Sequence, residues 1–468
     1  MKTALLVDFG STYTKLTAVD LDGPELVAQA QSPTTVDTDI TIGLGKAYQL
    51  LTTQLGVQSG WEADKVMACS SAAGGLRMVA IGLVPELTAE AAKLAALGAG
   101  AKVLCTYAYE LTNHEMEELV RLSPEILLLA GGTDGGNKDV VLHNARMLAG
   151  STLKAPIVIA GNKAASEEAE AILTSSEKPT RLTENVMPEL GKLNVEPARK
   201  AIRDIFMRRI VHAKGLDKAQ KTVGSVLMPT PMAVLAAARL LSEGTEEEAG
   251  LGELILVDVG GATTDVHSIG EGLPSQPGVI LKGLPPAYAQ RTVEGDLGIR
   301  YNALSILEIA GMRRIGEHLC GARGNLEEDI RSLCANVATV PKSERESALD
   351  IALARVALEI AVERHSGKVE AVHLPFGTMY VQHGKDLTNV RTVIGTGGIF
   401  AYNPEASPVL QGALFKQEEP FCLRPKQPEL YVDTRYLLYA IGLLAEVAPT
   451  QALQLAKRHL GVACSVER

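Results

Sequence analysis

One nine-residue pattern occurs twice in this 468-residue chain, at a constant offset of 250 residues. Residues 6–14 are LVDFGSTYT and residues 256–264 are LVDVGGATT, so that Leu, Val, Asp, Gly and the last Thr coincide. In each copy a short apolar run ends in an aspartate and is followed by a turn of glycine and hydroxyl residues. The repeat predicts two halves of similar build, each with an aspartate at the end of a buried strand.

The repeated turn contains the groups that a phosphate and a magnesium ion require. Glycine lets the backbone approach a ligand closely, and successive amides in such a turn form an anion-binding concavity. An aspartate at the strand end, Asp8 or Asp258, suits Mg²⁺, which prefers hard oxygen ligands and keeps several waters. We expect both carboxylates to lie beside solvent and the two loops to clamp one nucleotide. Further donors are the hydroxyls of Ser11, Thr12, Thr263 and Thr264, and Lys15 as a point charge.

A third glycine loop supports a nucleotide site. Residues 393–400 (VIGTGGIF) are expected to form a strand that enters the loop, and Pro404 fits the first turn of a following helix. Such a loop allows the backbone to pack flat against a ribose or a base. The chain has no GxxxxGK[ST] segment, so it is not a P-loop protein.

The segments LVDFGSTYTK, LVDVGGATTDV and VIGTGGIF resemble, in this order, the phosphate-1, phosphate-2 and adenosine motifs of one ATPase superfamily. That superfamily comprises actin, heat-shock chaperones and sugar kinases. The resemblance implies an α/β fold in which two ribonuclease-H-like lobes close on Mg-ATP, with Asp8 and Asp258 as catalytic residues that hold Mg²⁺ through water. It further implies a set of nucleotide-binding residues, namely Gly10, Ser11, Thr12, Thr14, Lys15, Gly260, Gly261, Thr263, Thr264, Asp265, Gly395, Gly397 and Gly398.

The segment before the second copy departs from the chaperone pattern. Chaperone members carry a glutamate there, whereas residues 229–233 of this chain are PTPMA. Water activation must therefore rest on Asp8 or Asp258, and we expect slow hydrolysis.

Four segments together are similar to the glutamate mutase accessory protein family, called MutL or GlmL and unrelated to the mismatch-repair protein. They are residues 8–15 (DFGSTYTK), 69–77 (CSSAAGGLR), 129–137 (LAGGTDGGN) and 258–268 (DVGGATTDVHS). The resemblance covers nearly the whole chain. It implies a reactivating chaperone for an adenosylcobalamin-dependent mutase.

The rhythm of apolar segments predicts three regions. Residues 1–75 are expected to form the core of the first lobe, a strand meander with a helix over residues 40–55. Residues 76–225 alternate short strands with helices, which predicts parallel strands with crossover helices. This additional α/β region, inserted in or after the first lobe, is the candidate for partner contact. Residues 226–468 are expected to form the second lobe, with one helical stretch over residues 302–335.

Composition argues against several classes of protein. A net charge of −10 and the lack of a Lys/Arg block argue against a nucleic-acid partner. No apolar run reaches the ~18 residues of a membrane span, and the N-terminus is unlike a signal peptide. The six cysteines show no CxxC spacing, which indicates reduced thiols in a cytoplasmic protein.

Three other segments have alternative interpretations. Residues 131–136 (GGTDGG) either bind an anion at a helix N-terminus or form a tight strand-to-helix connection, and residues 70–75 leave the same two readings. Residues 265–270 spell the DxHxxG of cobalamin-binding domains. The later elements of that motif do not follow at its spacing, so we expect His267 to be packed or solvated rather than a cobalt ligand.

The expected function is a Mg-ATP-dependent factor that drives release of damaged cobalamin from a mutase of the glutamate or methylaspartate type. Two alternatives use the same fold. A small-molecule kinase would need a carboxylate base that we cannot place, and a filament-forming actin-like protein should sediment with ATP.

Overall fold

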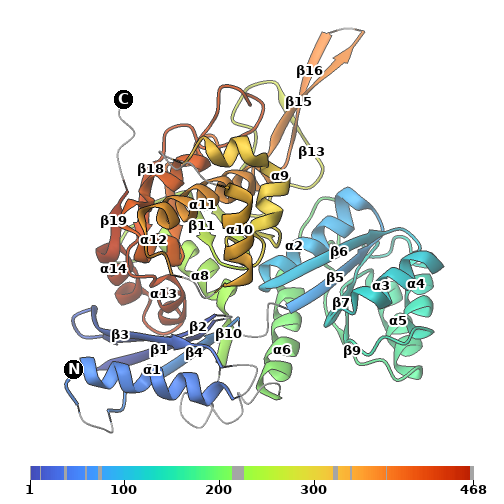
Figure 1. The fold of residues 1–468 in the computed structure, drawn as a ribbon. Helices are drawn as coiled ribbons and strands as arrows, with labels where there is room; N and C mark the ends of the chain where they lie inside the picture. Colours follow the sequence, from blue (N-terminus) through green and yellow to red (C-terminus); the bar gives the residue numbers. More distant parts are fainter. Residues whose placement is uncertain are drawn as a thin grey trace. The chain divides into compact units, whose positions relative to one another are not determined.

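The computed structural model describes residues 2–10, 12–35, 39–57, 61–71, 76–212, 226–319, 325–337, 340–375 and 377–463. The contacts divide the chain into two units, Met1–Val234 and Leu235–Arg468, and the boundary falls inside helix α8 (Thr230–Glu243) (Figure 1). Among the described residues, no helix combines the length and the apolar character needed to cross a membrane.

The first sheet of unit 1 starts as an antiparallel meander and continues with two parallel strands. Its elements are β1 (Thr3–Phe9), β2 (Tyr13–Asp20), β3 (Glu25–Pro33), helix α1 (Ile40–Gln54), β4 (Lys65–Ser70) and β10 (Val226–Pro229). The strand order is β10-β4-β1-β2-β3, in which β4 pairs parallel with both β1 and β10. The meander and the helix agree with the sequence expectation. β1 is buried along its whole length, and residues 4–7 form its apolar run before Asp8.

The second sheet of unit 1 is entirely parallel. Its strands are β5 (Leu76–Gly82), β6 (Ala101–Ala108), β7 (Ile126–Leu129), β8 (Ile157–Ile159) and β9 (Thr180–Leu182). The connecting helices are η1 (Pro85–Ala89), α2 (Glu90–Gly98), α3 (Asn113–Leu122), α4 (Asp139–Ala149) and α5 (Lys163–Ser175), and α6 (Glu196–His212) follows the last strand.

This parallel sheet has the order β6-β5-β7-β8-β9. Numbered along the chain, the order is 2-1-3-4-5, the arrangement of flavodoxin-like doubly wound folds. Helices α3, α4 and α5 share one apolar core with the strands, which includes Ile81, Leu119, Leu129, Ala145 and Leu173 (Figure 1). The expected parallel strands with crossover helices are therefore confirmed.

The main sheet of unit 2 repeats the strand order of the first sheet. Its strands are β11 (Leu254–Val259), β12 (Thr264–Ile269), β14 (Ala289–Glu294), β17 (Thr392–Thr396), β18 (Glu429–Asp433) and β19 (Leu460–Val462). The order β14-β12-β11-β17-β18-β19 starts with three antiparallel strands and continues with β17 and β18 parallel to β11. Both units thus contain the expected ribonuclease-H-like sheet, and the α/β fold class is confirmed.

Unit 2 contains several helices and one large core. The helices are α9 (Ala303–Gly316), α10 (Leu326–Ala335), α11 (Glu344–His365), α12 (Gly398–Tyr402), η2 (Pro404–Ala413), α13 (Leu438–Ala445) and α14 (Pro449–His459). The core joins the β11 strand to α9, α10, α11 and η2. The single helical stretch expected over residues 302–335 is two helices, and Gly311, at φ 75°, also interrupts α9.

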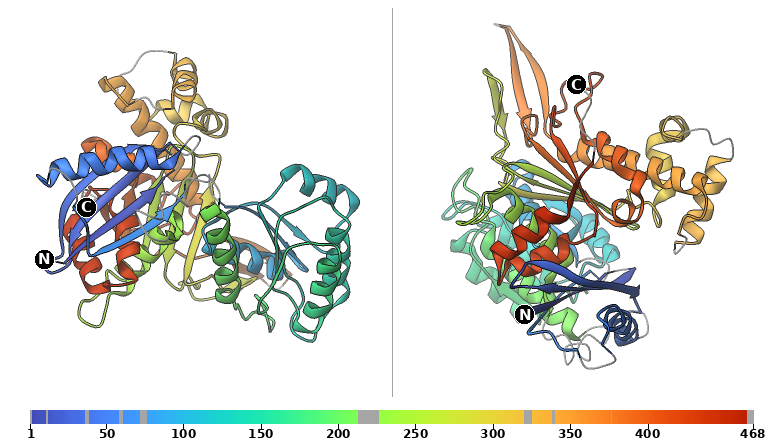
Figure 2. Two further views of the ribbon diagram at one scale, coloured as in Figure 1. Left: turned by 90° about the horizontal axis from the view of Figure 1, so that it is seen from below. Right: turned by 90° about the vertical axis from the view of Figure 1, so that its left-hand side faces the viewer.

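Unit 2 also has a small three-stranded sheet that extends away from its main sheet (Figure 2). Its strands are β13 (Val279–Lys282), β15 (Lys368–Leu374) and β16 (Gly377–His383). Most residues of β13 and β15 are exposed or half-buried. Because neither face of this small sheet is strongly buried, its strands show no clear alternation of apolar and polar residues in the sequence.

Candidate functional site

The two copies of the repeated pattern fold into the same turn. The Gly10 amide donates to the Tyr13 carbonyl at 3.0 Å, and the Gly260 amide donates to the Thr263 carbonyl at 2.9 Å. A Cβ on either glycine would lie less than 3.0 Å from that carbonyl oxygen, so each turn closes only around a glycine. Ser11 lies outside the described residues.

The strands on either side of each turn also pair in the same register. Asp8 lies opposite Lys15 across β1 and β2, and Asp258 lies opposite Asp265 across β11 and β12. Residues directly opposite each other on neighbouring strands share a face of the sheet. The sequence repeat is therefore a structural repeat, but the charge opposite the aspartate changes sign.

Asp8 is buried, and protein groups occupy both of its carboxylate oxygens. Lys15 Nζ donates to Oδ2 at 2.9 Å, and Thr230 Oγ1 donates to Oδ1 at 2.6 Å. The Cys69 thiol lies 3.6 Å from the same Oδ1. Asp8 is only 1% exposed, so the expectation of a carboxylate beside solvent is wrong for this residue.

Asp8 is covered because three parallel strands end together at one edge of the sheet. The pairing of β4 with β1 places Cys69 opposite Asp8, and β10, on the far side of β4, leads directly into Thr230. Burial, together with the charge of Asp8, raises the pKa of the Cys69 thiol, which stays protonated at neutral pH. Lys15 supplies the positive charge that a carboxylate at this depth requires.

The threonines that follow each turn bond to the protein. Thr14 Oγ1 lies 3.2 Å from Thr34 Oγ1, and Thr264 Oγ1 donates to the Leu297 carbonyl at 2.8 Å. Thr14 and Thr264 are both fully buried. The Thr12 carbonyl accepts from the Thr34 amide at 2.8 Å. These contacts hold the start of β2 and of β12 in place behind the turns.

Residues 298–302 brace the second turn through its carbonyl groups. Three backbone amides of this segment donate to the carbonyls of Gly260 and Gly261 at 2.9–3.2 Å. Asn302 Nδ2 donates to the Ala262 carbonyl at 2.8 Å. The turn is thereby fixed at each of its first three residues, which limits the cost of ordering it around a ligand.

Asp265 forms an ion pair with a buried arginine. Arg291 of β14 is 4% exposed, and its Nη2 donates to Asp265 Oδ1 at 3.2 Å. Burial lowers the pKa of Arg291, and the charge of Asp265 counteracts this shift. His267 lies opposite Arg291 in the sheet. Burial and this neighbouring cation lower the pKa of His267 well below its usual range, so it is a neutral, packed histidine, in line with the sequence expectation.

The third glycine loop meets the second aspartate loop within unit 2. The pairing of β17 with β11 places Thr396 opposite Asp258. Gly397 has a φ of 111°, and a Cβ there would lie 2.4 Å from the Val259 carbonyl oxygen and 3.0 Å from Asp258 Oδ1. Only a glycine permits this approach. Two segments 135 residues or more apart in the sequence thus form one surface.

The other two glycines of the third loop have different surroundings. A Cβ at Gly395 would lie 2.7 Å from the Phe400 ring and 2.8 Å from Leu410, so Gly395 allows α12 and η2 to pack against β17. Gly398 is the first residue of α12. A Cβ there would meet the Tyr402 ring at an ordinary distance of 3.8 Å.

Sequence reasoning missed two polar residues at these strand ends, Thr230 and Asp433. Asp433 ends β18, is 2% exposed, and accepts from Thr396 Oγ1 at 2.9 Å and from the Leu437 amide at 2.9 Å. Burial raises the pKa of Asp433. The available signal was the same in both places: a polar residue directly after a short apolar strand, as at Asp8.

Residues 131–136, which connect β7 to α4, have their polar groups bonded to neighbouring loops. Asn162 and Asn185, which follow β8 and β9, both bind this loop, and Asn185 Nδ2 donates to Asp134 Oδ1 at 3.0 Å. The same oxygen accepts from the Lys163 amide at the start of α5 at 3.0 Å. These contacts favour the tight-connection reading. Most of the other glycine loop, residues 72–75, lies outside the described residues.

The donor set of the two loops is compatible with magnesium. Among the described residues, no three His, Cys, Asp or Glu side chains form a metal-binding group. Mg²⁺ does not require such a group, because it keeps several waters and takes phosphate oxygens together with one or two carboxylates. Each unit supplies one aspartate at a strand end. At Asp8 the ion could approach Oδ2 only where Lys15 moves away.

The sequence matches identify the family. A family model described as MutL protein matches residues 4–460, and Protein MutL of Clostridium tetanomorphum is 52% identical over 462 residues, covering 98% of this chain and 99% of that protein. The chain belongs to the MutL family. The resemblance to the glutamate mutase accessory proteins, first indicated by four short segments, is confirmed for this MutL chain over nearly its full length.

Two solved structures resemble this MutL chain more distantly. Nucleotide-free acetone carboxylase is 13% identical with a TM-score of 0.40, covering 94% of this chain and 70% of that one. The nucleotide-free form of diol dehydratase-reactivating factor is 11% identical with a TM-score of 0.35, covering 95% and 99%. The fold assignment rests on the repeated strand order described above.

The four described cysteines, Cys69, Cys105, Cys334 and Cys422, are free thiols.

Proposed function

We propose that this chain is a Mg-ATP-dependent reactivating chaperone for an adenosylcobalamin-dependent mutase of the glutamate or methylaspartate type. One observation carries the nucleotide part: the aspartate, the turn and the cross-strand register recur at an offset of 250 residues in two sheets of the same strand order. Membership of the MutL family supports the mutase part. The proposed regions are residues 1–75 and 226–468 as the two ATPase lobes and residues 76–225 as the partner-binding region.

The proposed roles follow from the chemistry of each loop. Asp8 and Asp258 hold Mg²⁺ through its waters and orient the attacking water, while backbone amides of the two turns bind phosphate oxygens. The glycine loop of residues 395–398 accommodates the nucleoside. Bound Mg²⁺ would neutralise phosphate charge during hydrolysis. We propose slow turnover, because residues 229–233 offer no carboxylate as a further base.

Lys15 is proposed to exchange partners when the nucleotide binds. In the structure Lys15 neutralises Asp8, and the pair is about nine-tenths buried or more. A cation at Asp8 would compete with Lys15 for the same oxygen, whereas a phosphate would attract the displaced ammonium group. Magnesium and phosphate would therefore bind together at this loop more readily than either alone.

Thr230 is proposed to relay the state of Asp8 along the chain. Its hydroxyl donates to Asp8 Oδ1, and it is the first residue of α8, the helix inside which the boundary between the units falls. A helix is stiff over this length, so a shift at its first turn displaces its far end. Nucleotide binding can change the affinity for the mutase only if the two states of the protein differ in that affinity.

The experiment uses a purified glutamate mutase inactivated with damaged cobalamin. With this protein, ATP, Mg²⁺ and free adenosylcobalamin present, mutase activity should return and damaged cobalamin should appear in solution by absorbance. Reactions without ATP, or with the Asp258→Ala variant, serve as controls. Equal release of cobalamin with and without ATP would overturn the proposal.

A further inference from the structure

Three backbone amides of the second turn point away from the segment that braces it. The carbonyls of residues 260–262 all accept hydrogen bonds from residues 299–302. The peptide bonds here are trans, and in a planar trans peptide the amide points opposite to the carbonyl. The amides of residues 261–263 are therefore directed to the other side of the turn. No group in the described part of the chain accepts from them, so they form a concavity suited to an anion.

A buried ion pair fixes the bracing segment to helix α11. Arg300 Nη1 and Nη2 donate to the two carboxylate oxygens of Asp350 at 2.8 and 2.5 Å. This two-pronged geometry makes arginine–carboxylate pairs directional as well as strong. The two side chains are 13% and 4% exposed. Arg300 Nη1 also donates to the Ile299 carbonyl at 3.1 Å, so one guanidinium group holds both the helix and the backbone of its own segment.

Arg300 also contacts the second turn itself. Its amide donates to the Gly261 carbonyl at 2.9 Å. A Cβ on Gly261 would lie 3.5 Å from Cβ and Cγ of Arg300, so the backbone of the turn packs beside the stem of this side chain. Asp350, the partner of Arg300, lies on α11, and most residues of that helix from 349 to 362 are buried in the core of unit 2. Arg300 thus ties the turn to the core.

The two members of this pair depend on each other. Burial raises the pKa of Asp350, and the hydrogen bonds and charge of Arg300 counteract this shift. Without Arg300 the carboxylate would be buried without a counter-charge, which is unfavourable. Without Asp350 the guanidinium group would lose its two hydrogen bonds to α11, and the long side chain would regain its freedom of rotation. Either loss would release residues 299–302, which set the direction of the three amides.

We propose that Arg300 and Asp350 are positioning residues, which hold the amides of residues 261–263 in the direction that binds the phosphate groups of the nucleotide. The inference rests on the proposed function, since that function supplies the nucleotide, and it names the pair that sets the geometry of the phosphate site. A turn that is ordered in advance saves the cost of ordering it on binding. Loss of the pair should therefore weaken binding of ligands that carry phosphate, while hydrolysis of nucleotide already bound should change little.

Three variants weaken the pair to different degrees. Arg300→Ala removes the guanidinium group, and Asp350→Asn removes its counter-charge. Arg300→Lys keeps a positive charge beside Asp350 but cannot form the two-pronged contact. Because Arg300→Lys leaves no buried charge without a partner, it decides the outcome if either of the other variants fails to fold.

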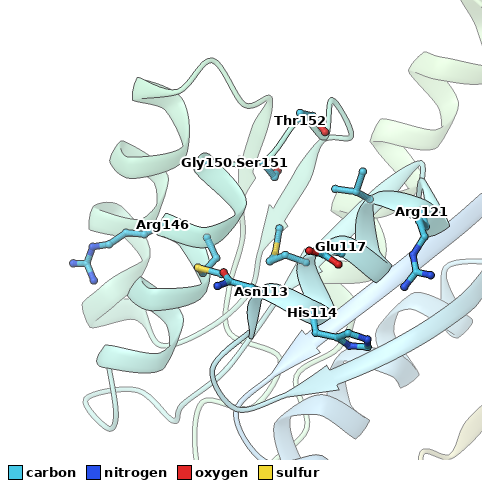
Figure 3. A pocket seen from close by; sticks show the side chains of 11 residues that line it. Asn113, His114, Glu117, Arg121, Arg146, Gly150, Ser151 and Thr152 are labelled. Atoms are coloured by element: carbon cyan, nitrogen blue, oxygen red, sulfur yellow. The ribbon is translucent and has the colours of Figure 1, made fainter.

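Two other arginines serve as controls. Arg314 forms an ion pair with Glu359, whose side chain is 4% exposed, like that of Asp350. Glu359 lies on the same helix α11, about 13 Å further along at the rise of an α-helix, so Arg314→Ala disturbs a comparable pair at a distance from Asp350. Arg146 of α4 points away from the open groove between α3 and α4 (Figure 3). It lies 3.7 Å from Glu168, and both side chains are about 60% exposed, so Arg146→Ala removes only a weak surface pair.

The test measures the affinity of the whole chain for ATP and for adenosine, a ligand without phosphate, by calorimetry with Mg²⁺ present. Steady-state hydrolysis and thermal unfolding of every variant accompany it. Arg300→Ala and Asp350→Asn should each weaken ATP binding and raise KM about tenfold, and Arg300→Lys about threefold, with kcat within about twofold of the wild type. Binding of adenosine should not change. Arg314→Ala should lower the unfolding temperature without changing the affinity for ATP, and Arg146→Ala should change neither.

The outcomes separate this inference from the proposed function. Unchanged affinity for ATP in the folded variants of Arg300 and Asp350 would overturn the inference alone. An equal loss of affinity for ATP and for adenosine, or the same loss in Arg314→Ala, would assign the pair a general structural role, which also contradicts the inference. No binding of ATP by the wild type would overturn the nucleotide part of the proposed function and the inference with it.

Discussion

The two aspartate loops have the same turn and the same register, yet they differ in what lies opposite the aspartate. In unit 1 the opposite residue is Lys15, and the pair is neutral and buried. In unit 2 the opposite residue is Asp265, which forms an ion pair with Arg291 from the next strand. The two copies share the residues that the turn requires, whereas the charge of the residue opposite the aspartate differs. Under the proposed function, a cation at Asp8 would have to compete with Lys15 for the same carboxylate oxygen.

The largest expected effect is the loss of ATP hydrolysis when either aspartate is removed. The two substitutions should differ in their effect on stability. Asp8→Ala and Asp258→Ala should each lower ATP hydrolysis about a hundredfold or more, the size expected for loss of one preorganised electrostatic group. Asp8→Ala should also cost about 3 kcal/mol of unfolding free energy, because it leaves Lys15 buried without a counter-charge. Asp258→Ala should cost less than about 1 kcal/mol. Urea unfolding and steady-state hydrolysis measure the two quantities.

The double variant Asp8→Ala/Lys15→Ala sharpens this comparison. Removing both charges should recover about 2 kcal/mol relative to Asp8→Ala alone, since coupled partners in one network are not additive. Hydrolysis should stay lost. Equal stability of the single and double variants would show that Lys15 does not depend on Asp8, and the exchange proposed for Lys15 would then fail.

A smaller expected effect is the loss of folding stability at acidic pH. Behind the second loop, His365 bonds to Ser268 Oγ and Thr292 Oγ1, each at 2.8 Å, and burial lowers its pKa to about 3. The unfolded state, with a histidine pKa near 6.5, binds more protons below that pH. Stability is therefore complete above pH 6.5 and falls as the pH drops toward 3. The loss should be about 2 kcal/mol at pH 5.

The first sheet serves as the comparison for this loss of stability at acidic pH. Its counterparts of His267 and Ser268, at the same offset of 250, are Thr17 and Ala18, and no histidine precedes His114 in the sequence. Unfolding in urea at pH 7 and pH 5, followed by hydrogen exchange in unit 2, should show the loss there. His365→Gln should reduce the difference between the two pH values. An unchanged pH dependence in that variant would assign the effect to other groups.

The smallest effect tests the hydroxyl at the start of α8. Thr230→Val keeps the shape of the side chain but removes the hydrogen bond to Asp8, which should cost about 1.5 kcal/mol. Thr230→Ser retains the hydroxyl and should stay close to the wild type. If Thr230 relays the nucleotide state, ATP should alter hydrogen exchange along α8 in the wild type and in the serine variant, but less in the valine variant. Equal changes in all three would exclude a relay through this bond.

Much of the fold could be predicted because its signals are local. The apolar run before Asp8, the glycine of each turn and the strand–helix rhythm of residues 76–225 depend on neighbouring residues alone, and all were found. The projecting sheet of β13, β15 and β16 was missed, since its half-exposed strands lack a clear period. The division of the expected helical stretch into α9 and α10 was also missed, because helical periodicity is present in the sequence of both segments.

The sequence by itself determined the repeated turn, the family and which residue types stand at each strand end. Only the tertiary structure decided which of these residues meet. Thr230 binds Asp8 across 222 residues of chain, and Gly397 approaches Asp258 across 139 residues, because parallel strands bring their ends to one edge of a sheet. Strand order is set by the packing of whole elements, which no local pattern encodes. For that reason the burial of Asp8 could not be foreseen from the loop that contains it.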